Sequence, residues 1–402
     1  MKIGILREGK TPPDKRVAFT PEQCVEIQHK FPQLSLVVQK SAIRAFPDAE
    51  YADKGITLVD SVADCDVIVG VKEVPIPALI PNKKYFFFSH TFKQQPYNRT
   101  LLQAVVDKNI ELIDYEVLIG RDGKRIIGFG KYAGIVGAYN GILAFGKKSG
   151  LFALKPANQC FDRAEMEQEF AKVTLPKNFK LVMTGAGRVA GGAMEVFNGM
   201  GIKKVKPQAF LDDEFDGPVY TQILVTDYNI RKDGAPFKRR EFFADPVPFK
   251  SNFLRFAKVA DVYTSCHYWN HRSPIIISRE DLKNPDLKLT VVSDISCDID
   301  CAVGSTLRPS TIAEPLYGYD PATEKEVDFM ADGAIGVMAV DNLPCELPRD
   351  ASGDFGREFI DAVLPELVNG DPDRIIAKAT ETRNGDLTPE FEYLRPYLEG
   401  KE

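Results

Sequence analysis

Residues 180–201 read KLVMTGAGRVAGGAMEVFNGMG, and this stretch decides the fold of the chain around it. The apolar residues 181–183 predict a buried strand, because they form a short run that ends at a glycine turn. The small and apolar residues over 189–200 have the spacing of a helix that packs on a sheet. Strand, turn and helix in this order are typical of the first unit of a dinucleotide-binding fold.

The turn carries the glycine pattern GxGxxA, and Gly191 extends it to GxGxxxG. Glycines here let the backbone approach a pyrophosphate closely, and the free N–H groups at the start of the helix face the anion. We therefore predict dinucleotide binding, against the alternative of a merely tight turn. The predicted cofactor-binding residues of the turn are Gly185, Gly187, Arg188 and Val189.

Length and composition limit the classes of protein that remain. A chain of 402 residues fits two domains of about 200 residues each. The net charge of -6 gives no basic footprint, so we expect no nucleic-acid partner. No apolar run approaches about 18 residues, so we expect no membrane partner. The N-terminus opens directly into a strand-like run, which predicts a cytoplasmic protein.

The cysteines do not predict a metal site. Seven of them are scattered along the chain. Cys297 and Cys301 form a CxxxC, but no second pair or neighbouring histidine completes a zinc site. We expect reduced, mostly buried thiols and no bound metal.

The first 130 residues alternate strand and helix signals, which predicts a mostly parallel sheet with helices on both faces. Helices are expected at 21–31, with Thr20 as N-cap, and at 98–108. This part lacks a glycine-rich phosphate turn, so we expect it to bind the substrate. The expected strands are 2–7, 34–38, 56–59, 66–71, 84–89 and 110–115.

Charged residues stand at the carboxyl ends of these strands, where α/β sheets bind their ligands. For any one residue a solvated loop charge is the simpler interpretation, but together they predict a site that grips a carboxylate-rich small molecule. The residues that converge are Lys10, Arg16, Lys72, His90, Glu116 and Arg125.

The second half continues the nucleotide-binding pattern. A glycine-rich apolar helix at 132–150 joins the two lobes, and a second strand is expected at 203–210. Asp212, Asp213 and Glu214 follow about 20 residues after the turn, where an acid commonly binds the ribose. Residues 211–252 show no clear periodicity and are interpreted as an insertion. Later elements are strands at 259–265, 289–293 and 333–340, and a helix at 351–367.

Several motifs resemble the lysine-forming saccharopine dehydrogenases, also called lysine–2-oxoglutarate reductases, within the alanine dehydrogenase and transhydrogenase superfamily. The resemblance covers nearly the whole chain, and the last two motifs are long and specific. The motifs are DKRVAFTP, GVKEVP, FFSHTFKQQ, LIDYE, TGAGRVAGGA, SDISCDIDCAVGSTLRPSTIAEPLY and DNLPCELPRDAS.

The resemblance implies catalytic roles for three residues. Lys72 matches the base that accepts the proton of a secondary amine, and His90 matches the histidine that shuttles protons as the imine is hydrolysed. Glu116 matches a glutamate placed to tune the pKa of that lysine.

It also implies binding roles. Arg16 and Arg125 match arginines that hold substrate carboxylates, and Lys10 belongs to the same cluster at a spacing one residue different from the fungal pattern. Asp294 or Asp298, and Asn342, are expected near the nicotinamide.

The implied architecture is α/β, with two doubly wound, mostly parallel domains flanking a cleft. A Rossmann-like substrate domain would span 1–134 and be completed by 343–402, and a Rossmann nucleotide-binding domain would span 135–342.

The leading functional interpretation is an NAD(P)-dependent oxidoreductase that interconverts saccharopine with lysine and 2-oxoglutarate. An alanine dehydrogenase or opine-type enzyme is the alternative, and a non-catalytic nucleotide-binding protein of the same fold is the second. The acids after Phe210 favour NAD, whereas Arg188 and GxGxxxG also suit NADP. A homo-oligomer is compatible with the sequence.

Overall fold

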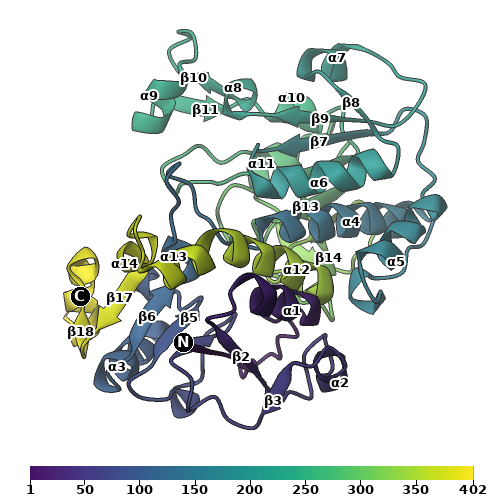
Figure 1. The fold of residues 1–402 in the computed structure, drawn as a ribbon. Coiled ribbons are helices and arrows are strands. Elements are labelled where there is room, and N and C mark those ends of the chain that lie inside the picture. The colour runs from purple at the N-terminus through teal and green to yellow at the C-terminus, as the bar shows by residue number, and fades with distance from the viewer. Residues whose placement is uncertain (402) are drawn as a thin grey trace. The chain divides into compact units, whose positions relative to one another are not determined.

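The computed structural model describes residues 1–401, which form two compact units. Unit 1 comprises Met1–Phe129 and the chain from Pro348 onwards, and unit 2 is Gly130–Leu347. The expected boundary at 134/135 falls inside α4 (Gly130–Ser149), an unbroken helix that begins unit 2 (Figure 1). The expected boundary at 342/343 precedes a 3-10 turn, Leu343–Glu346, that still belongs to unit 2.

Unit 1 contains an eight-stranded sheet in the order β18-β17-β6-β5-β4-β1-β2-β3. The six strands from β6 to β3 run parallel, as the alternating sequence pattern predicted. Their bounds are β1 Lys2–Ile5, β2 Ser35–Gln39, β3 Thr57–Val59, β4 Val67–Val69, β5 Lys84–Phe87 and β6 Glu111–Asp114.

The helices of unit 1 include both that the sequence predicted early in the chain. Thr20 caps α1 in a capping box, in which its hydroxyl accepts the N–H of Gln23 at 3.3 Å and the Gln23 side chain accepts the N–H of Thr20 at 3.0 Å. The helices are α1 Pro21–Lys30, α2 Asp48–Ala52, α3 Arg99–Asp107, α12 Pro348–Glu358, α13 Leu364–Asn369, α14 Ile375–Ala379 and α15 Arg395–Glu399.

The C-terminal segment completes the core of unit 1. The helix predicted at 351–367 is two helices, α12 and α13, joined by a π-helical turn at Phe359–Val363. Phe355 and Phe359 pack in the same buried cluster as Phe86 and Tyr115. The pair β17 (Thr380–Arg383) and β18 (Asp386–Leu387), which the sequence did not predict, adds two antiparallel strands beside β6.

Unit 2 contains a second eight-stranded sheet, in the order β15-β14-β16-β13-β12-β7-β9-β8. The strands from β16 to β8 are parallel, and β14 and β15 are antiparallel. The bounds are β7 Lys180–Thr184, β8 Lys203–Val205, β9 Val219–Ile223, β12 Val262–Ser265, β13 Val291–Asp294, β14 Leu316–Asp320, β15 Lys325–Val327 and β16 Ile335–Met338.

The region after the glycine turn departs from the prediction. The strand expected at 203–210 ends at Val205, because Pro207 begins α7 (Pro207–Asp212), where a fixed φ suits the first helical turn. The interpretation of 211–252 as an insertion is wrong in part. This region contains β9, a buried strand that pairs directly with β7.

The remainder of that region does project beyond the sheet. It holds a short antiparallel pair, β10 (Asn229–Arg231) and β11 (Phe249–Ser251), with α8 (Val225–Tyr228) and α9 (Arg239–Ala244). Unit 2 also has α5 Arg163–Gln168, α6 Arg188–Gly199, α10 Leu254–Ala257 and α11 Arg279–Leu282.

The helices α4 and α6 lie side by side in backbone contact (Figure 1). A Cβ built on Gly134 of α4 would lie 1.9 Å from the carbonyl oxygen of Val189, and one on Gly192 of α6 would lie 2.0 Å from that of Lys131. Only glycine fits at either position, so these two residues fix α6, the helix that begins at the nucleotide turn, against α4.

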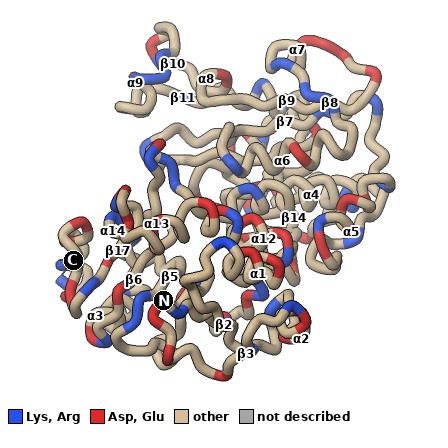
Figure 2. Tube along the Cα trace, in the orientation of Figure 1, with Lys and Arg blue, Asp and Glu red and all other residues tan. Residues whose placement is uncertain are grey.

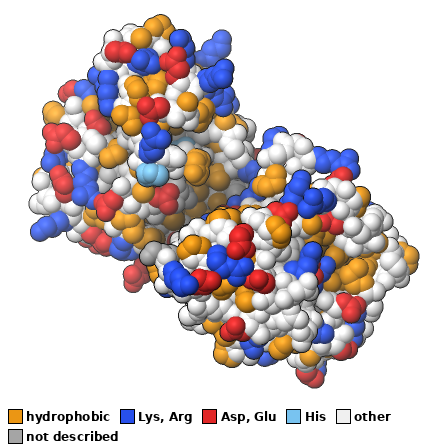
Figure 3. All heavy atoms as spheres, turned by 90° about the vertical axis from the view of Figure 1, so that its left-hand side faces the viewer, with side chains coloured by type: hydrophobic (Ala, Val, Ile, Leu, Met, Phe, Trp, Pro, Cys, Tyr) orange, Lys and Arg blue, Asp and Glu red, His pale blue; other side chains and the backbone are white. Residues whose placement is uncertain are grey.

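Acidic and basic residues are both spread along the Cα trace in Figure 2, and acidic, basic and hydrophobic side chains are interspersed on the face shown in Figure 3. No helix within residues 1–401 has the length and apolar character needed to cross a bilayer.

The adjacent glycines of α6 provide a test of this packing. Gly192→Ala should destabilise unit 2 by about 1–3 kcal/mol, because backbone cannot yield to the added methyl as a flexible side chain would. Gly191→Ala, whose Cβ meets nothing within 4 Å, should be neutral or stabilising by up to about 1 kcal/mol. Chemical denaturation measures the free energy of unfolding of both variants. Equal free energies for Gly192→Ala and Gly191→Ala would contradict the close packing of α4 and α6.

Candidate active site

In unit 1 the loops that follow β1, β4, β5 and β6 carry the candidate catalytic residues, because the carboxyl ends of parallel strands meet at one edge of the sheet. The buried Glu8, just after β1, links the first two loops. Its carboxylate accepts the N–H of Val71 at 2.7 Å and that of Lys72 at 2.9 Å. Burial raises the pKa of Glu8 to about 7.

Glu73 is the carboxylate around which the site is organised. Its Oε1 lies 2.5 Å from Nδ1 of His90, and its Oε2 lies 2.7 Å from Nζ of Lys10. Burial alone would raise its pKa, but the bonds to His90 and Lys10 prevail and hold the pKa of Glu73 at about 2. Glu73 therefore stays ionised and orients the His90 ring.

Lys72 is half-buried beside this pair. Burial lowers the pKa of its ammonium, the nearby Arg16 and Lys10 lower it further, and Glu73 opposes them. Within residues 1–401 no carboxylate forms an ion pair with the Lys72 ammonium. Lys72 is thus a lysine that gives up its proton more readily than a surface lysine, as a general base must.

Glu116 occupies a different place from the one expected of it. Its carboxylate lies 3.0 Å from Nζ of Lys93, 3.2 Å from a guanidinium nitrogen of Arg125 and 3.8 Å from Nε2 of His90. Glu73 is a glutamate whose charge raises the pKa of Lys72. The structure thus places Glu116 beside the histidine, and the tuning role that the sequence assigned to it stays a prediction.

Arg16 also differs from the expectation. Its guanidinium is paired with Asp14 through bonds of 3.0 and 2.6 Å, stacks 4.1 Å from the centre of the Phe129 ring, and is 2% exposed. A buried, paired arginine is poorly placed to hold a substrate carboxylate, and it acts on Lys72 through its charge instead. Lys10, Lys93 and Arg125 are the partly exposed cations of the cluster.

Glu73, Glu8 and Lys93 are site residues that the sequence analysis did not select. Glu73 follows Lys72 within GVKEVP and Lys93 follows His90 within FFSHTFKQQ, so the motifs themselves were the available signal. Glu8 differs, because its role depends on a contact with a loop 63 residues further along the chain.

In unit 2 the glycine turn has the geometry of an anion site. Gly185 has a φ of +100°, and a Cβ there would lie 2.2 Å from the carbonyl oxygen of Cys266, so glycine is required. Gly187 caps α6, no side chain occupies the cap, and nothing lies within 4 Å of its Cβ position. The N–H groups of Arg188 and Val189 in the first turn of α6 can therefore bind a pyrophosphate.

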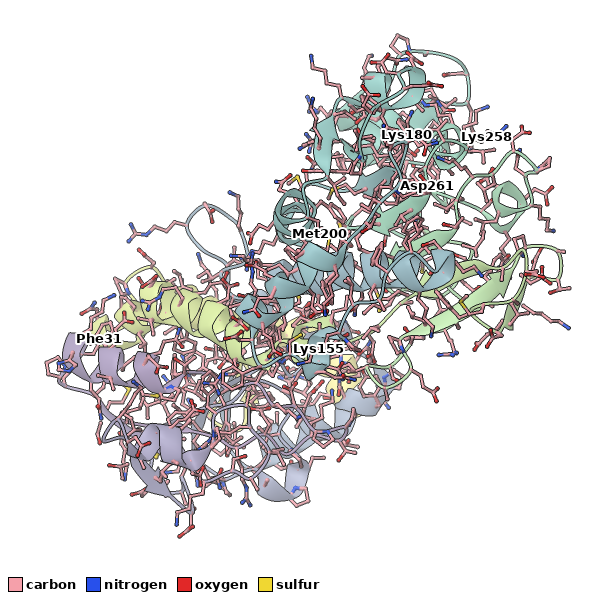
Figure 4. The ribbon with its side chains drawn as sticks, turned by 90° about the vertical axis from the view of Figure 1, so that its right-hand side faces the viewer. Phe31, Lys155, Lys180, Met200, Lys258 and Asp261 are labelled. Carbon is pink, nitrogen blue, oxygen red and sulfur yellow. The ribbon has the colours of Figure 1, made fainter. Side chains whose placement is uncertain are left out.

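Asp212 is not placed near this turn. The order β7-β9-β8 puts β9, not β8, beside β7, so the strand that should lead to the ribose is β9. Asp212 ends α7, and the ammonium of Lys180, the first residue of β7, reaches the carbonyl of the next residue, Asp213, at 2.8 Å. Figure 4 shows Lys180 near Asp261, at the amino ends of the strands. The structure therefore does not bring Asp212 to the glycine turn, where the sequence analysis expected it.

The other predicted cofactor residues follow parallel strands at the carboxyl edge of the same sheet. Asp294 ends β13 and is fully buried, and Asn342 follows β16. Asp298 is exposed. Asp294 accepts bonds from the hydroxyls of Ser265, Ser296 and Thr306, so it holds the loops together.

Two further features lie at this edge of unit 2. Burial lowers the pKa of His267, which follows β12, to about 4, and its Nδ1 lies 2.7 Å from the hydroxyl of Thr184. Its buried Nε2 has no partner within residues 1–401. A cavity of about 160 Å³ lies beyond β9 and β12, with Tyr228, Phe242 and Trp269 among its walls.

Within residues 1–401 no group of three or more histidine, cysteine, aspartate or glutamate side chains could hold a metal ion.

Residues 4–136 match the family described as alanine dehydrogenase/PNT, N-terminal domain. A solved L-alanine dehydrogenase matches with a TM-score of 0.68 and 18% identity, covering 99% of this chain and 100% of that one. This likeness confirms the predicted fold class, α/β with two mostly parallel sheets.

Two relatives by sequence cover nearly the whole chain. An alpha-aminoadipic semialdehyde synthase of Arabidopsis thaliana is 29% identical over 98% of this chain and 41% of that protein. A saccharopine dehydrogenase (NAD(+), L-lysine-forming) of Yarrowia lipolytica is 26% identical over 90% of each. The chain thus spans less than half of the first relative. The comparisons confirm the resemblance to lysine-forming saccharopine dehydrogenases.

The electrostatic assignment of Lys72 can be tested without turnover. Glu73→Gln should lower the pKa of Lys72 further, because it removes the nearby negative charge that opposes the shift, whereas Glu116→Gln should leave it unchanged. The measurement is the pH dependence of Lys72 acetylation by acetic anhydride, read by peptide mass spectrometry with the exposed Lys40 as internal reference. A shift in Glu116→Gln alone would reverse the assignment.

Proposed function

We propose that this chain is an NAD(P)-dependent oxidoreductase acting on a CH–NH bond, which interconverts saccharopine with L-lysine and 2-oxoglutarate. The observation that carries the proposal is the Lys72–Glu73–His90 cluster. It combines a lysine of lowered pKa with a histidine oriented by an ionised glutamate. The relative named saccharopine dehydrogenase, which matches over 90% of both chains, supports the same reaction.

The residues of unit 1 have the properties that the two chemical stages need. Oxidation of a secondary amine to an imine requires a base for the amine proton, and neutral Lys72 can take it. Hydrolysis of the imine requires a group that moves protons to and from water. His90 can do so through Nε2, because its Nδ1 is held by Glu73.

Saccharopine carries several carboxylates, and the partly exposed cations of unit 1 suit them. Lys10, Lys93 and Arg125 are each 38 or 39% exposed at the side chain. Each already contacts Glu73 or Glu116, so a substrate carboxylate would compete with a glutamate or join it. Arg125, with its planar guanidinium, is the residue we propose as the principal carboxylate contact.

Unit 2 would hold the nicotinamide dinucleotide, which supplies hydride transfer when bound. Its pyrophosphate would lie on the N–H groups of the α6 N-terminus, and the aromatic cavity beyond β9 and β12 would receive its base. The argument from Asp212 for NAD no longer holds. β9 ends at Ile223 and the next residue, Leu224, is not acidic; the nearby Asp227 carboxylate accepts the N–H of Leu224 at 2.7 Å.

The second candidate is an alanine dehydrogenase-type reaction. The match of residues 4–136 to the alanine dehydrogenase/PNT domain favours it. The deciding experiment is an oxidation assay with NADH and with NADPH, supplied in parallel with lysine plus 2-oxoglutarate and with ammonia plus pyruvate. Saccharopine detected by mass spectrometry in the first mixture supports the proposal, and turnover of the second mixture alone favours the alternative.

The catalytic roles predict a large loss of turnover without loss of binding. Lys72→Met and His90→Gln should each lower kcat by about 10²–10⁴, since each acts on a proton in the transition state. Lys93→Met, a neighbouring cation, is the matched control and should affect mainly the Michaelis constant of the carboxylate substrate. Folded Lys72→Met and His90→Gln variants with kcat within a few-fold of wild type would refute the mechanism.

The cofactor site predicts a separable effect. Gly187→Val should abolish dinucleotide binding while the fold persists, because its Cβ position is open in the free protein and its side chain would occupy the pyrophosphate position. Isothermal titration calorimetry with NADH and NADPH measures this. Unchanged affinity in the folded variant would show that the turn does not bind the cofactor.

A further inference from the structure

Below the His90 loop of unit 1 lies a chain of four buried oxygen groups. Oδ2 of Asp114 lies 2.5 Å from the hydroxyl of Ser89, which lies 2.6 Å from the hydroxyl of Thr91. The Thr91 hydroxyl in turn bonds Oε2 of Glu381. All four residues are fully buried. Burial shifts the pKa of Glu381, as do Asp114, Thr91 and Ser89, and none of these groups is a lysine or arginine.

Glu381 lies at a β-bulge of β17, which turns its side chain toward the buried hydroxyls. In the pairing of β17 with β6, Thr380 lies opposite Ile113 and Thr382 opposite Leu112, so the register shifts at Glu381. A bulge turns the extra residue away from its regular direction, and such irregularities commonly re-aim a side chain at a functional site. The C-terminal segment thus places a carboxyl group beneath a loop nearly 300 residues earlier in the chain.

The short contacts determine how many protons the chain holds. Three short oxygen–oxygen contacts join Asp114, Ser89, Thr91 and Glu381 in sequence, and each needs one hydrogen between its two oxygens; a fourth contact, from the Ser89 hydroxyl to Oε1 of Glu381, is longer at 3.4 Å. The hydroxyls of Ser89 and Thr91 provide two. If both carboxyls were ionised, the 2.6 Å contact between the hydroxyls would have no hydrogen. A third proton must therefore be on one of the two carboxyl groups.

The surroundings identify which carboxyl carries it. Asp114 accepts three backbone N–H groups, from Ser89 at 2.8 Å, His90 at 3.1 Å and Glu116 at 2.7 Å, as an ionised carboxylate does. Within residues 1–401 only the two hydroxyls hydrogen-bond to the Glu381 carboxyl. Glu381 thus donates to Thr91, Thr91 to Ser89, and Ser89 to Asp114.

We propose that Glu381 is a protonated positioning residue whose hydrogen-bonded chain fixes Asp114, and through Asp114 the backbone of both His90 and Glu116. His90 needs such support because its φ of +57° is unfavourable for a residue with a side chain. The importance of this support for turnover rests on the proposed function. The protonation of Glu381 does not.

Burial, with the charge of Asp114, raises the pKa of Glu381 to about 8. The titratable groups facing the pair are His90, Tyr115 and Tyr393, from the β5 loop, the β6 loop and the 3-10 helix Pro389–Leu394. Because the pKa of Glu381 is higher in the folded than in the unfolded protein, its contribution to the free energy of unfolding is complete below pH 4.5. That contribution is lost as pH rises through about 8. Glu381→Gln should remove this pH dependence of unfolding.

Infrared spectroscopy tests the protonation directly. The difference spectrum of wild type minus Glu381→Gln near neutral pH should show the C=O band of a protonated carboxylic acid, which disappears above about pH 8. Glu346→Gln, a buried glutamate of unit 2, is the control and should leave this band in place. A difference spectrum that contains only carboxylate bands would overturn the proposal, whether or not the protein has the proposed activity.

Kinetics test the positioning role. Glu381→Gln should keep kcat within a few-fold of wild type, because its amide N–H donates to Thr91 as the carboxylic acid does, whereas Glu381→Ala should lower it about 10–100-fold. Thr91→Ser and Thr91→Val form a second pair, in which only serine keeps the hydroxyl. The Michaelis constant for the nucleotide should be unchanged in all four variants. Equal kcat within either pair would overturn the positioning role.

Discussion

Two buried carboxylates that accept backbone N–H groups hold the loops of unit 1 in place, and the candidate site depends on them. Glu8 binds the N–H groups of Val71 and Lys72, and Asp114 binds those of Ser89, His90 and Glu116. Loops at the end of a parallel sheet have no ladder of their own to satisfy their backbone groups. A carboxylate with two oxygens can satisfy several at once, so side-chain positions follow from backbone positions.

The charged residues of the candidate site shift the pKa values of the neighbouring Glu73 and Lys72. Glu73, with a pKa of about 2, remains an anion, while burial and the positive charges of Arg16 and Lys10 lower the pKa of Lys72. Arg16 exerts its effect without reaching the surface, because Asp14 binds it within the protein. A site that must both take and return protons needs such differences between adjacent side chains.

The sequence was sufficient where local patterns determine structure. The turn at Gly185, the capped helix after Thr20 and the six parallel strands of unit 1 were predicted because their signals lie within a few residues. The sequence was insufficient where the order of strands in the sheet differs from their order along the chain. The acid expected at Asp212 depended on β8 lying beside β7, but β9 takes that place. The surroundings of Glu116 and Arg16 could not be predicted, because their partners, Lys93 and Asp14, are known only from the fold.

The C-terminal segment has a consequence for the order in which the chain can become folded during synthesis. Phe355 and Phe359 fill the core of unit 1, and β17 covers one edge of its sheet. Unit 2 is encoded between the two parts of unit 1 and needs neither of them for its own sheet. During synthesis on the ribosome, therefore, unit 2 can complete its core first. The strands of unit 1 are made earlier, but their apolar face stays exposed until the C-terminal segment is synthesised.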